Sequence, residues 1–448
     1  MTTASKMGQT NRQQKLISHQ VTKIKEKVIA WRRDFHRYPE VGWTEYRTSA
    51  RIADLLSEMG FEVQVGSEVI KRESRMGVPD AKTLAQAKEQ ALKKGANPQW
   101  IEKMEDGLTG VVGCWDTKRP GPTIAFRFDI DALNILEDQT EDHIPCREGF
   151  RSEQEGVMHA CGHDGHTAIG LGIASLISCL EESLAGKVKL IFQPAEEGVR
   201  GAKAMVDAGV LDGVDYFFSG HLGVVARKEN QIVCGVTDFF ATTKLDVTLE
   251  GIPAHAGLAP HEGRNALLAA ATIALQLHAI ARHGTGQSRI NVGTMQAGEG
   301  RNIIPSQARL QLETRGTTNE VNQYMVDETL RIIHSAAEMF GVKEHVEFAG
   351  QAVATQCDPE LIEWMEEVVK NIERVDEVIP TLSFGASEDA TFMMEKVQSQ
   401  GGKASYLLFG TPLKAGHHHY SFDFSEDACV LAIEVLGNIL FRLASTIN

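Results

Sequence analysis

The sequence predicts an α/β protein with a mixed, mostly parallel sheet flanked by helices, and a smaller α+β domain inserted into it. Apolar, β-branched runs alternate with helical stretches, which is the pattern of βαβ units. The sequence pattern changes between about 240 and 355. Strands in which apolar and polar residues alternate, together with two long helical stretches, predict the inserted domain there. At 448 residues the chain is also long enough for more than one core.

The first part of the chain opens with an amphipathic helical stretch over 22–59, interrupted near Pro39, and a short strand over 61–65. Residues 72–106 are rich in Lys, Glu, Gln and Ala, which predicts a helical insertion exposed to solvent rather than core. We then expect strands over 123–128, 187–192 and 216–219, and helices over 166–182 and 199–209. Parallel strands end at one edge of a sheet, so the residues that follow them should meet there.

The inserted domain is predicted from strands over 244–249, 289–295 and 307–314, with helices over 264–282 and 318–340. After 358 the helix and strand pattern of the first part returns. We therefore divide the chain into a main domain over 1–239 and 357–448, with the inserted domain over 240–356.

Composition and charge exclude several classes of function. The chain has 45 basic and 60 acidic residues, and the net charge of -15 disfavours nucleic acid or an anionic membrane as partner. The first 20 residues lack the apolar core of an export signal, and the Ala-rich run over 266–281 contains Gln276 and His278, so we expect no membrane span. Seven scattered cysteines are typical of reduced thiols in a cytoplasmic protein.

Residues 158–166 place three histidines, a cysteine and an aspartate just before a predicted helix. Any one of these histidines could be an ordinary core residue. This density of nitrogen and sulfur donors, however, suits a divalent ion such as Zn²⁺, Mn²⁺, Co²⁺ or Ni²⁺.

The adjacent acids Glu196 and Glu197 follow an apolar strand. The plain alternative is a solvated charge pair. Because adjacent side chains diverge, one carboxylate can instead bind a metal while the other takes a proton from water. His221, at a strand end, and the run His417 to His419 add two more segments. Four such segments predict a site for two metal ions.

Five stretches carry a resemblance to a known family: residues 31–40, 126–133, 159–166, 193–198 and 254–257. They resemble the M20 metallopeptidase family, in its amidohydrolase branch, from about residue 28 to the C-terminus. The insertion over 72–106 and the histidine run are most similar to the aminobenzoyl-glutamate utilization subgroup. The resemblance implies that the inserted domain is ferredoxin-like and serves as a lid and a dimerisation surface.

Matched position by position, the resemblance implies Glu196 as general base and five metal ligands: Cys161, His163, Glu197, His221 and His418. For the last ligand, His417 and His419 remain alternatives. Arg127 stands where peptidase members carry a ligand histidine, a departure for which Cys161 compensates. Asp129 is then expected to orient or neutralise groups near the metals.

The resemblance also implies site residues in the inserted domain. His255 matches a histidine that reaches a neighbouring subunit's active site and stabilises the oxyanion, although a capping or core histidine is the alternative. Asn302 and Arg315 match positions that hold the substrate carbonyl and carboxylate, with Arg301 as the second choice for the carboxylate. A planar guanidinium can hold a carboxylate through two hydrogen bonds, but a surface ion pair is the alternative.

The resemblance implies metal-assisted hydrolysis of an N-acyl amino acid by two divalent ions, Mn²⁺ or Zn²⁺ first and Co²⁺ or Ni²⁺ as alternatives. The resemblance implies p-aminobenzoyl-glutamate as the substrate, cleaved to p-aminobenzoate and glutamate, with indole-3-acetyl-aspartate or another N-acyl amino acid as alternatives. Two other hypotheses are a non-catalytic partner in a heteromeric hydrolase and a nucleophilic Cys161 beside His163 or His166. The family implies a homodimer, with a heteromer of homologous subunits as the alternative.

Overall fold

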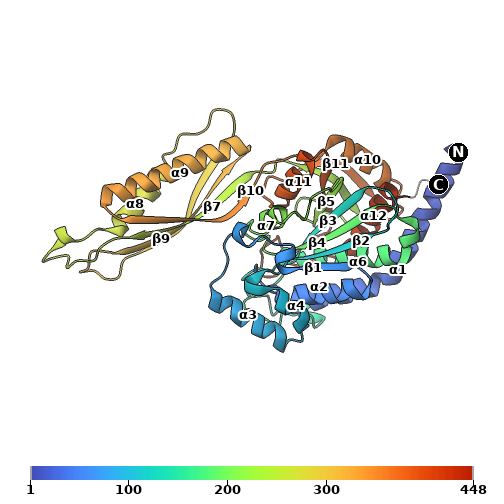
Figure 1. The fold of residues 1–448 in the computed structure, drawn as a ribbon, viewed down its shortest axis with the longest axis horizontal. Coiled ribbons are helices and arrows are strands. Elements are labelled where there is room, and N and C mark those ends of the chain that lie inside the picture. The colour runs from blue at the N-terminus through green and yellow to red at the C-terminus, as the bar shows by residue number, and fades with distance from the viewer. Residues whose placement is uncertain (1–2, 446–448) are drawn as a thin grey trace.

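The computed structural model describes residues 3–445, which form two bodies built on separate sheets (Figure 1). The larger body contains the strands β1 (Glu62–Val65), β2 (Val111–Asp116), β3 (Thr123–Asp129), β4 (Lys187–Gln193), β5 (Tyr216–Leu222), β6 (Gln231–Thr237), β11 (Glu377–Ser383) and β12 (Lys403–Phe409). Its helices are α1 (Thr3–Arg37), α2 (Tyr46–Glu58), α3 (Ala81–Lys93), α4 (Pro98–Lys103), α5 (Ile144–Arg147), α6 (His163–Leu180), α7 (Ala202–Asp207), α10 (Pro359–Val369), α11 (Ala390–Ser399) and α12 (Asp427–Leu443). The smaller body contains β7 (Ala241–Glu250), β8 (Ser288–Ala297), β9 (Gln307–Gly316), β10 (Lys343–Ala352), α8 (Ala266–Leu277) and α9 (Asn319–Phe340).

The large sheet has eight strands in the order β1-β2-β4-β3-β5-β12-β6-β11. β3 runs parallel to both β4 and β5, and β12 runs parallel to β5, whereas β2 and β6 run antiparallel to the neighbours they share with this group. The predicted mixed, mostly parallel sheet is confirmed. Since β3, β4 and β5 share one direction, their carboxyl ends lie at the same edge.

Helices cover both faces of this sheet. α6 packs on β3, β4 and β5, and α12 and α1 pack on α6, while α7 and α11 contact each other on the other face. α6 lies close to the sheet at Gly170. A β-carbon at this position would come within 2.6 Å of Phe128 and 2.7 Å of Phe192, so only glycine fits there without a shift. This close approach holds the first turn of α6, which begins at His163, near the carboxyl ends of the strands.

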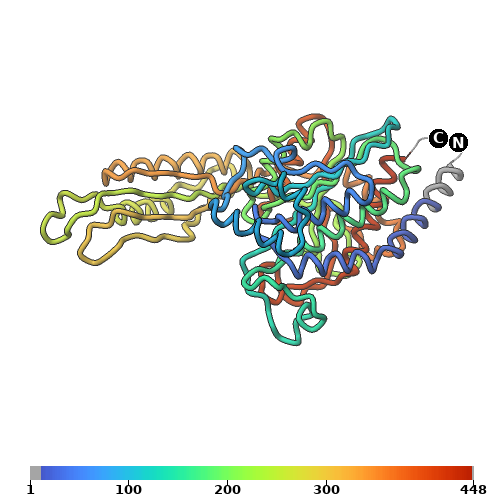
Figure 2. The backbone as a smooth tube through the Cα atoms, turned by 60° about the horizontal axis from the view of Figure 1, so that its bottom comes forward, coloured from blue at the N-terminus to red at the C-terminus, as the bar shows by residue number. Residues whose placement is uncertain are grey.

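The small sheet is antiparallel, in the order β10-β7-β9-β8, and extends as an arm away from the larger body (Figure 2). α8 and α9 pack on one face. Leu245, Val247 and Leu249 of β7 point into that core, and Lys244 and Asp246 alternate with them on the face that carries no helix. The predicted α+β architecture of the inserted region is confirmed.

The insertion forms the two helices α3 and α4, but the prediction that it stays outside the core is wrong. Leu84, Ile101 and Met104 are buried and join the main core against α2. The charged residues of the segment occupy only the outer face, and composition averaged over both faces hid the inner one. None of the helices in residues 3–445 is both long and apolar enough to cross a membrane.

Candidate metal centre

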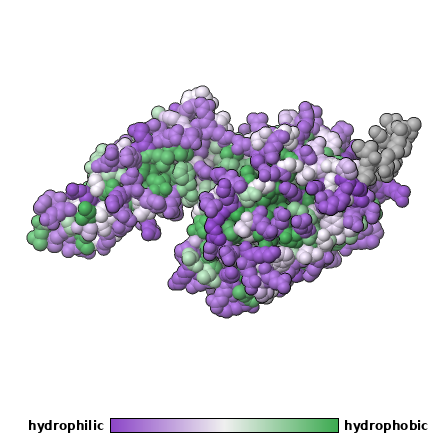
Figure 3. Space-filling model, viewed as in Figure 1, coloured by the Kyte–Doolittle hydropathy of each residue, from purple (hydrophilic) through white to green (hydrophobic). Residues whose placement is uncertain are grey.

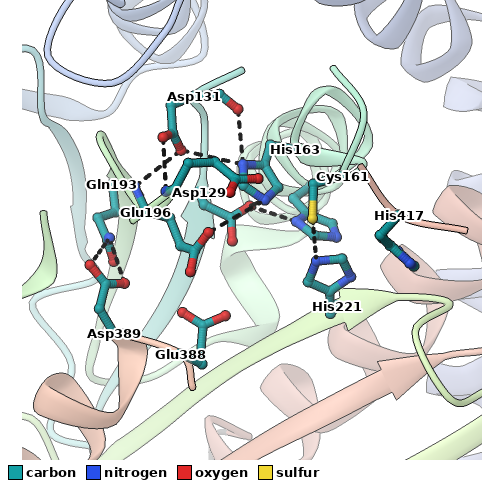
Figure 4. A network of polar contacts seen from close by, with 12 residues as sticks. Asp129, Asp131, Cys161, His163, Gln193, Glu196, His221, Glu388, Asp389 and His417 are labelled. Carbon is teal, nitrogen blue, oxygen red and sulfur yellow. Dashed lines mark hydrogen bonds and ion pairs between the residues drawn. The ribbon is translucent and has the colours of Figure 1, made fainter. Parts of the chain in front are cut away.

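Residues from separate segments converge at the carboxyl edge of the large sheet (Figure 4). Cys161 Sγ lies 3.4 Å from His221 Nε2, and His163 Nε2 lies 3.9 Å from Glu196 Oε2. Potential ligand atoms lie within 4.8 Å of one another in three overlapping groups: Cys161, His163 and His221; Cys161, Glu197 and His418; and His163, Glu196 and Glu197. The structure therefore brings all five predicted ligands together around the predicted base.

The Nδ1 hydrogen bonds of two histidines turn Nε2 of each ring toward the cluster. His163 donates Nδ1–H to the Asp131 carbonyl at 2.9 Å, and its buried Nε2 has no hydrogen-bond partner within the described residues. His221 donates Nδ1–H to the Leu222 carbonyl at 2.8 Å, which turns its Nε2 toward Cys161. An unpartnered buried polar atom is costly. A divalent ion that accepts nitrogen, sulfur and oxygen ligands would satisfy these atoms, so the residues fit the expected group.

The three consecutive histidines differ in what their rings contact. His417 donates Nε2–H to the Leu222 carbonyl at 3.2 Å, and the exposed His419 accepts the Ser421 N–H on Nδ1. His418 alone of the three places a nitrogen at the cluster, with Nε2 3.4 Å from Glu197 Oε1. Its left-handed backbone, with φ of 63°, turns the side chain in this direction.

The loop after β4 holds Glu196 and Glu197 in diverging directions. Ala195 and Val199 adopt positive φ values of 52° and 59°, a strained conformation that concentrates at functional sites. The Asp131 carboxylate accepts the N–H groups of Glu196, at 3.1 Å, and Glu197, at 3.0 Å. These two bonds fix the peptide between the two acids, so one carboxylate joins the ligand cluster while the other lies beside it.

A buried ion-pair network that sequence reasoning missed lies under Glu196. Arg127 donates to Asp129 at 2.8 Å, Glu388 at 3.1 Å and Asp389 at 3.0 Å. The Glu196 carboxylate points toward Glu388 and Asp389 (Figure 4). The available signal was a second pair of adjacent acids after a strand, here β11, which repeats the arrangement of Glu196 and Glu197 after β4.

The surroundings change the pKa values of several site residues. Burial, together with the negative charges of Glu388 and Glu197, raises the pKa of Glu196 well above its usual value. Burial also lowers the pKa of His221 well below its usual value, which favours the neutral imidazole that a metal ligand must be. The Asp129 carboxyl has a depressed pKa: burial opposes the shift, but the charge of His163 outweighs it.

His166 and Cys161 do not form a nucleophile and base pair. His166 donates Nδ1–H to Asp129 at 2.6 Å and accepts the Leu222 N–H on Nε2 at 3.0 Å, so both ring nitrogens are occupied. Burial raises the pKa of the Cys161 thiol, and the charge of Glu197 adds to the effect. A raised pKa disfavours the thiolate that nucleophilic catalysis needs.

Comparison with known proteins identifies the family. The family described as peptidase family M20/M25/M40 matches residues 125–442, more than half of the chain. The chain belongs to this peptidase family. One of the subunits of p-aminobenzoyl-glutamate hydrolase from Escherichia coli (strain K12) is 49% identical over 418 residues, which cover 93% of this chain and 96% of that protein.

Two further M20 relatives are similar to this chain over almost its whole length. The indole-3-acetyl-aspartic acid hydrolase of Enterobacter agglomerans is 47% identical over 94% of this chain and 97% of its own. The crystal structure of the aminobenzoyl-glutamate utilization protein from Klebsiella pneumoniae superposes with a TM-score of 0.82 and 42% identity, covering 94% of this chain and 97% of that one. The M20 chain is accordingly a metal-dependent amidohydrolase.

The M20 chain does not bring three predicted residues to its own metal centre. His255 follows the end of β7 remote from the large sheet, and a bridge to Ile303 places Arg301 and Asn302 at the same end. β7 has 10 residues, so this end lies roughly 30 Å from its start beside the large body. His255 Nδ1 accepts the N–H groups of Gly257 and Leu258 and is exposed.

Arg315 lies at the near end of the small sheet, where it pairs with Thr242 across β7 and β9. Its guanidinium is already occupied, because Nε and Nη2 donate to the two carboxylate oxygens of Glu313 at 2.9 and 3.2 Å. Lys244 also contacts Glu313, at 3.3 Å. The predicted carboxylate-binding residue therefore sits in an ion pair of its own domain.

Proposed function

We propose that the chain hydrolyses the amide bond of an N-acyl amino acid whose amino acid is acidic. The first substrate is p-aminobenzoyl-glutamate, and indole-3-acetyl-aspartate is the alternative. The names of two relatives that match almost the full length support this choice, because both name the amide of an acidic amino acid. The observation that carries the chemistry is the donor cluster beside Glu196, in which the buried atoms His163 Nε2 and Glu197 Oε1 lack hydrogen-bond partners within residues 3–445.

We assign the cluster to two divalent ions, Mn²⁺ or Zn²⁺ first, with Co²⁺ or Ni²⁺ as alternatives. Bound there, such ions supply polarisation of the scissile carbonyl and of the attacking water. The residues that would hold them are Cys161, His163, Glu197, His221 and His418. Asp129 acts behind them: it accepts from Arg127 and His166 and keeps His166 in one tautomer.

Glu196 moves the proton in this proposal. Its carboxylate takes a proton from the attacking water, the new C–O bond forms at the acyl carbon, and the C–N bond then breaks. Glu196 returns the same proton to the departing amino nitrogen, which leaves a free acid and a free amino acid. Burial raises the pKa of Glu196, which supports this role because a raised pKa makes the carboxylate a stronger proton acceptor.

We further propose that His255 acts on the metal centre of a second protomer, where it stabilises the oxyanion. Its place at the far end of the arm supports an action in trans. Apolar surface gathers on the arm over α8 and α9 (Figure 3), and Leu275 and Met339 are 73% and 71% exposed. Such a patch is typical of an interaction surface. A homodimer is the first proposal. The Escherichia coli relative is named as one of the subunits of its hydrolase, which supports a heteromer as the alternative.

We also propose that residues 1–239 and 357–448 form the catalytic domain and that 240–356 form a lid and dimerisation domain, which the two separate cores support. We place the enzyme in the cytoplasm, where its seven cysteines, all of them free thiols within the described residues, would stay reduced.

The test is a substrate panel on the chain purified alone. Metal is removed with a chelator and returned as Mn²⁺ or Zn²⁺, and hydrolysis of p-aminobenzoyl-glutamate, indole-3-acetyl-aspartate and neutral N-acyl amino acids is compared by kcat/KM. We expect activity only after metal is returned, with the acidic substrates preferred. A chain that binds metal but cleaves nothing in the panel would overturn the proposal and favour the hypothesis of a non-catalytic partner.

A further inference from the structure

A cleft of about 510 Å³ lies between the loop that carries Glu197 and the face of the small sheet that carries no helix. This volume is within the range typical of small-molecule sites, roughly 300–1,000 Å³. The lining residues are mostly polar and include Glu197, Arg200, Lys244, Asn291, Gln311 and Glu313. Because Glu197 belongs to both the cleft and the metal cluster, a ligand in the cleft lies beside the metal centre.

Two basic side chains line this cleft, and they differ in whether a carboxylate pairs with them. Lys244 lies 3.3 Å from the carboxylate of Glu313. Arg200 makes its two side-chain hydrogen bonds to backbone carbonyls, from Nε to Glu197 at 2.8 Å and from Nη1 to Gly77 at 3.0 Å. Within residues 3–445 no carboxylate forms an ion pair with Arg200, so its charge is available to a ligand.

Two hydrogen bonds fix the Arg200 side chain, and neighbouring glycines leave room for it. A β-carbon at Gly42 would lie 2.2 Å from its Nη2, one at Gly77 would lie 2.8 Å from its Cδ, and one at Gly198 would lie 3.2 Å from its Nε. A side chain at Gly42 or Gly77 would meet the guanidinium in its present position, so these glycines leave room for it. A cation held in one conformation loses little entropy when an anion binds.

We propose that Arg200 binds a carboxylate of the amino-acid part of the substrate. The proposal rests on the proposed function and names a residue for the acidic preference. An immobilised guanidinium with uncommitted N–H groups matches a carboxylate, and it lies in the cleft that leads to Glu197. Arg315, the residue that sequence reasoning favoured, is already paired with Glu313. The carboxylate that Arg200 meets is either the α-carboxylate or that of the side chain.

Three substrates of nearly equal shape show whether Arg200 binds the α-carboxylate or the side-chain carboxylate. p-Aminobenzoyl-glutamate keeps both charges, p-aminobenzoyl-glutamine lacks the side-chain charge, and p-aminobenzoyl-isoglutamine lacks the α charge. The metal-loaded full chain is assayed with each as wild type, Arg200→Met and Arg200→Lys. Lys203→Met is the matched control, because it removes a cation three positions along that pairs with Asp207 outside the cleft. Bound metal is measured in every variant.

We expect Arg200→Met to lower kcat/KM for p-aminobenzoyl-glutamate by about 100-fold and to affect one of the two amides by less than about 3-fold. The amide that is spared identifies the carboxylate that Arg200 binds. Arg200→Lys should recover part of the loss, and Lys203→Met should match the wild type. An equal loss on all three substrates, or no loss, overturns the proposal. A wild-type chain that hydrolyses none of them contradicts the proposed function instead.

Discussion

Glu196 and Glu197 lie in different surroundings because of their backbone, although they are chemically identical neighbours. Asp131 accepts both of their N–H groups, and the positive φ of Ala195 turns the chain just before them. Glu197 thereby joins Cys161 and His418, while Glu196 faces Glu388 in a buried site. The same side chain in two environments thus suits the two proposed roles, a metal ligand for Glu197 and a base for Glu196.

Replacing Glu196 with alanine tests this division. We expect bound metal to stay at the wild-type level, since Glu197 and the other ligands remain, and kcat to fall by about 10²–10⁴-fold because the proton acceptor is gone. Metal analysis and steady-state kinetics on one preparation measure both quantities. Glu182→Ala, at a side chain 91% exposed, is the control. Near-normal turnover in Glu196→Ala would remove the residue from the mechanism.

The histidine run provides a second test at this scale. His418→Ala should weaken the binding of at least one ion by more than the roughly 10–100-fold that loss of an outer partner costs. His419→Ala should leave binding unchanged, because its ring contacts only the Ser421 N–H and Tyr420 within the described residues. Equilibrium dialysis against Mn²⁺ or Zn²⁺ measures both variants. Weaker binding in His419→Ala and not in His418→Ala would reverse the assignment.

At the scale of elements, α6 both carries the proposed ligand His163 and is fixed to α1. Its first turn carries Asp164, which accepts from Arg32 at 2.8 Å and from His36 at 2.9 Å, both on α1. His36 also contacts Glu137 at 2.9 Å, and all four groups are buried. A buried network of this kind loses stability when one member is removed, because a charge is left unpaired.

The stability of this junction should depend on pH. Burial opposes the shift, but hydrogen bonds to Asp164 and Glu137 raise the pKa of His36 to about 9 from 6.5. Its contribution is therefore complete below pH 6.5 and is lost as pH rises to about 9. His36→Asn should cost about 3–5 kcal/mol near pH 6 and much less above pH 9. Urea unfolding of the metal-free chain at several pH values measures the difference.

The Glu137 carboxylate of the same network gives the opposite dependence of stability on pH. Burial opposes it, but hydrogen bonds from His143 and His36 lower the pKa of Glu137 to about 2 from 4.5. This contribution is present above pH 4.5 and is lost as pH falls toward 2.

The control for His36→Asn is His345→Asn, which removes an exposed pair with Glu347 and should change stability little at any pH. A cost of His36→Asn that does not vary between pH 6 and 9 would contradict the linkage.

At the scale of the whole molecule, the arm carries His255 away from the metal centre of its own chain. An active site completed in trans would then combine Glu196 of one protomer with His255 of another. Symmetric association places the same pair at both sites of a dimer. The exposed apolar side chains on the arm agree with such an association.

Mixed dimers test that arrangement. Glu196→Ala and His255→Ala chains should each be nearly inactive alone, and mixed, exchanged dimers should recover roughly a quarter of wild-type activity, because one site in each hetero-pair has both residues. Activity after co-refolding or co-expression, with size measured by light scattering, gives the result. Mixing that restores nothing although hetero-pairs form would show that His255 does not act in trans.

The pattern of residues along the chain was enough for the fold class and for the segments of the candidate metal centre. Strand and helix periods are local, and Cys161, His163, Glu196 and Glu197 stand in short runs beside predicted element ends. Their meeting follows from parallel strands that end at one edge.

Tertiary structure alone decided how these groups are paired. Glu388 joins Arg127 from 261 positions away, the Leu222 carbonyl occupies His417 and leaves His418 for the cluster, and Glu313 occupies Arg315 while Arg200 bonds only to backbone carbonyls in the described part of the chain. Each outcome depends on which partner comes within hydrogen-bond distance after packing. Long-range packing sets those distances, and local sequence patterns do not contain them.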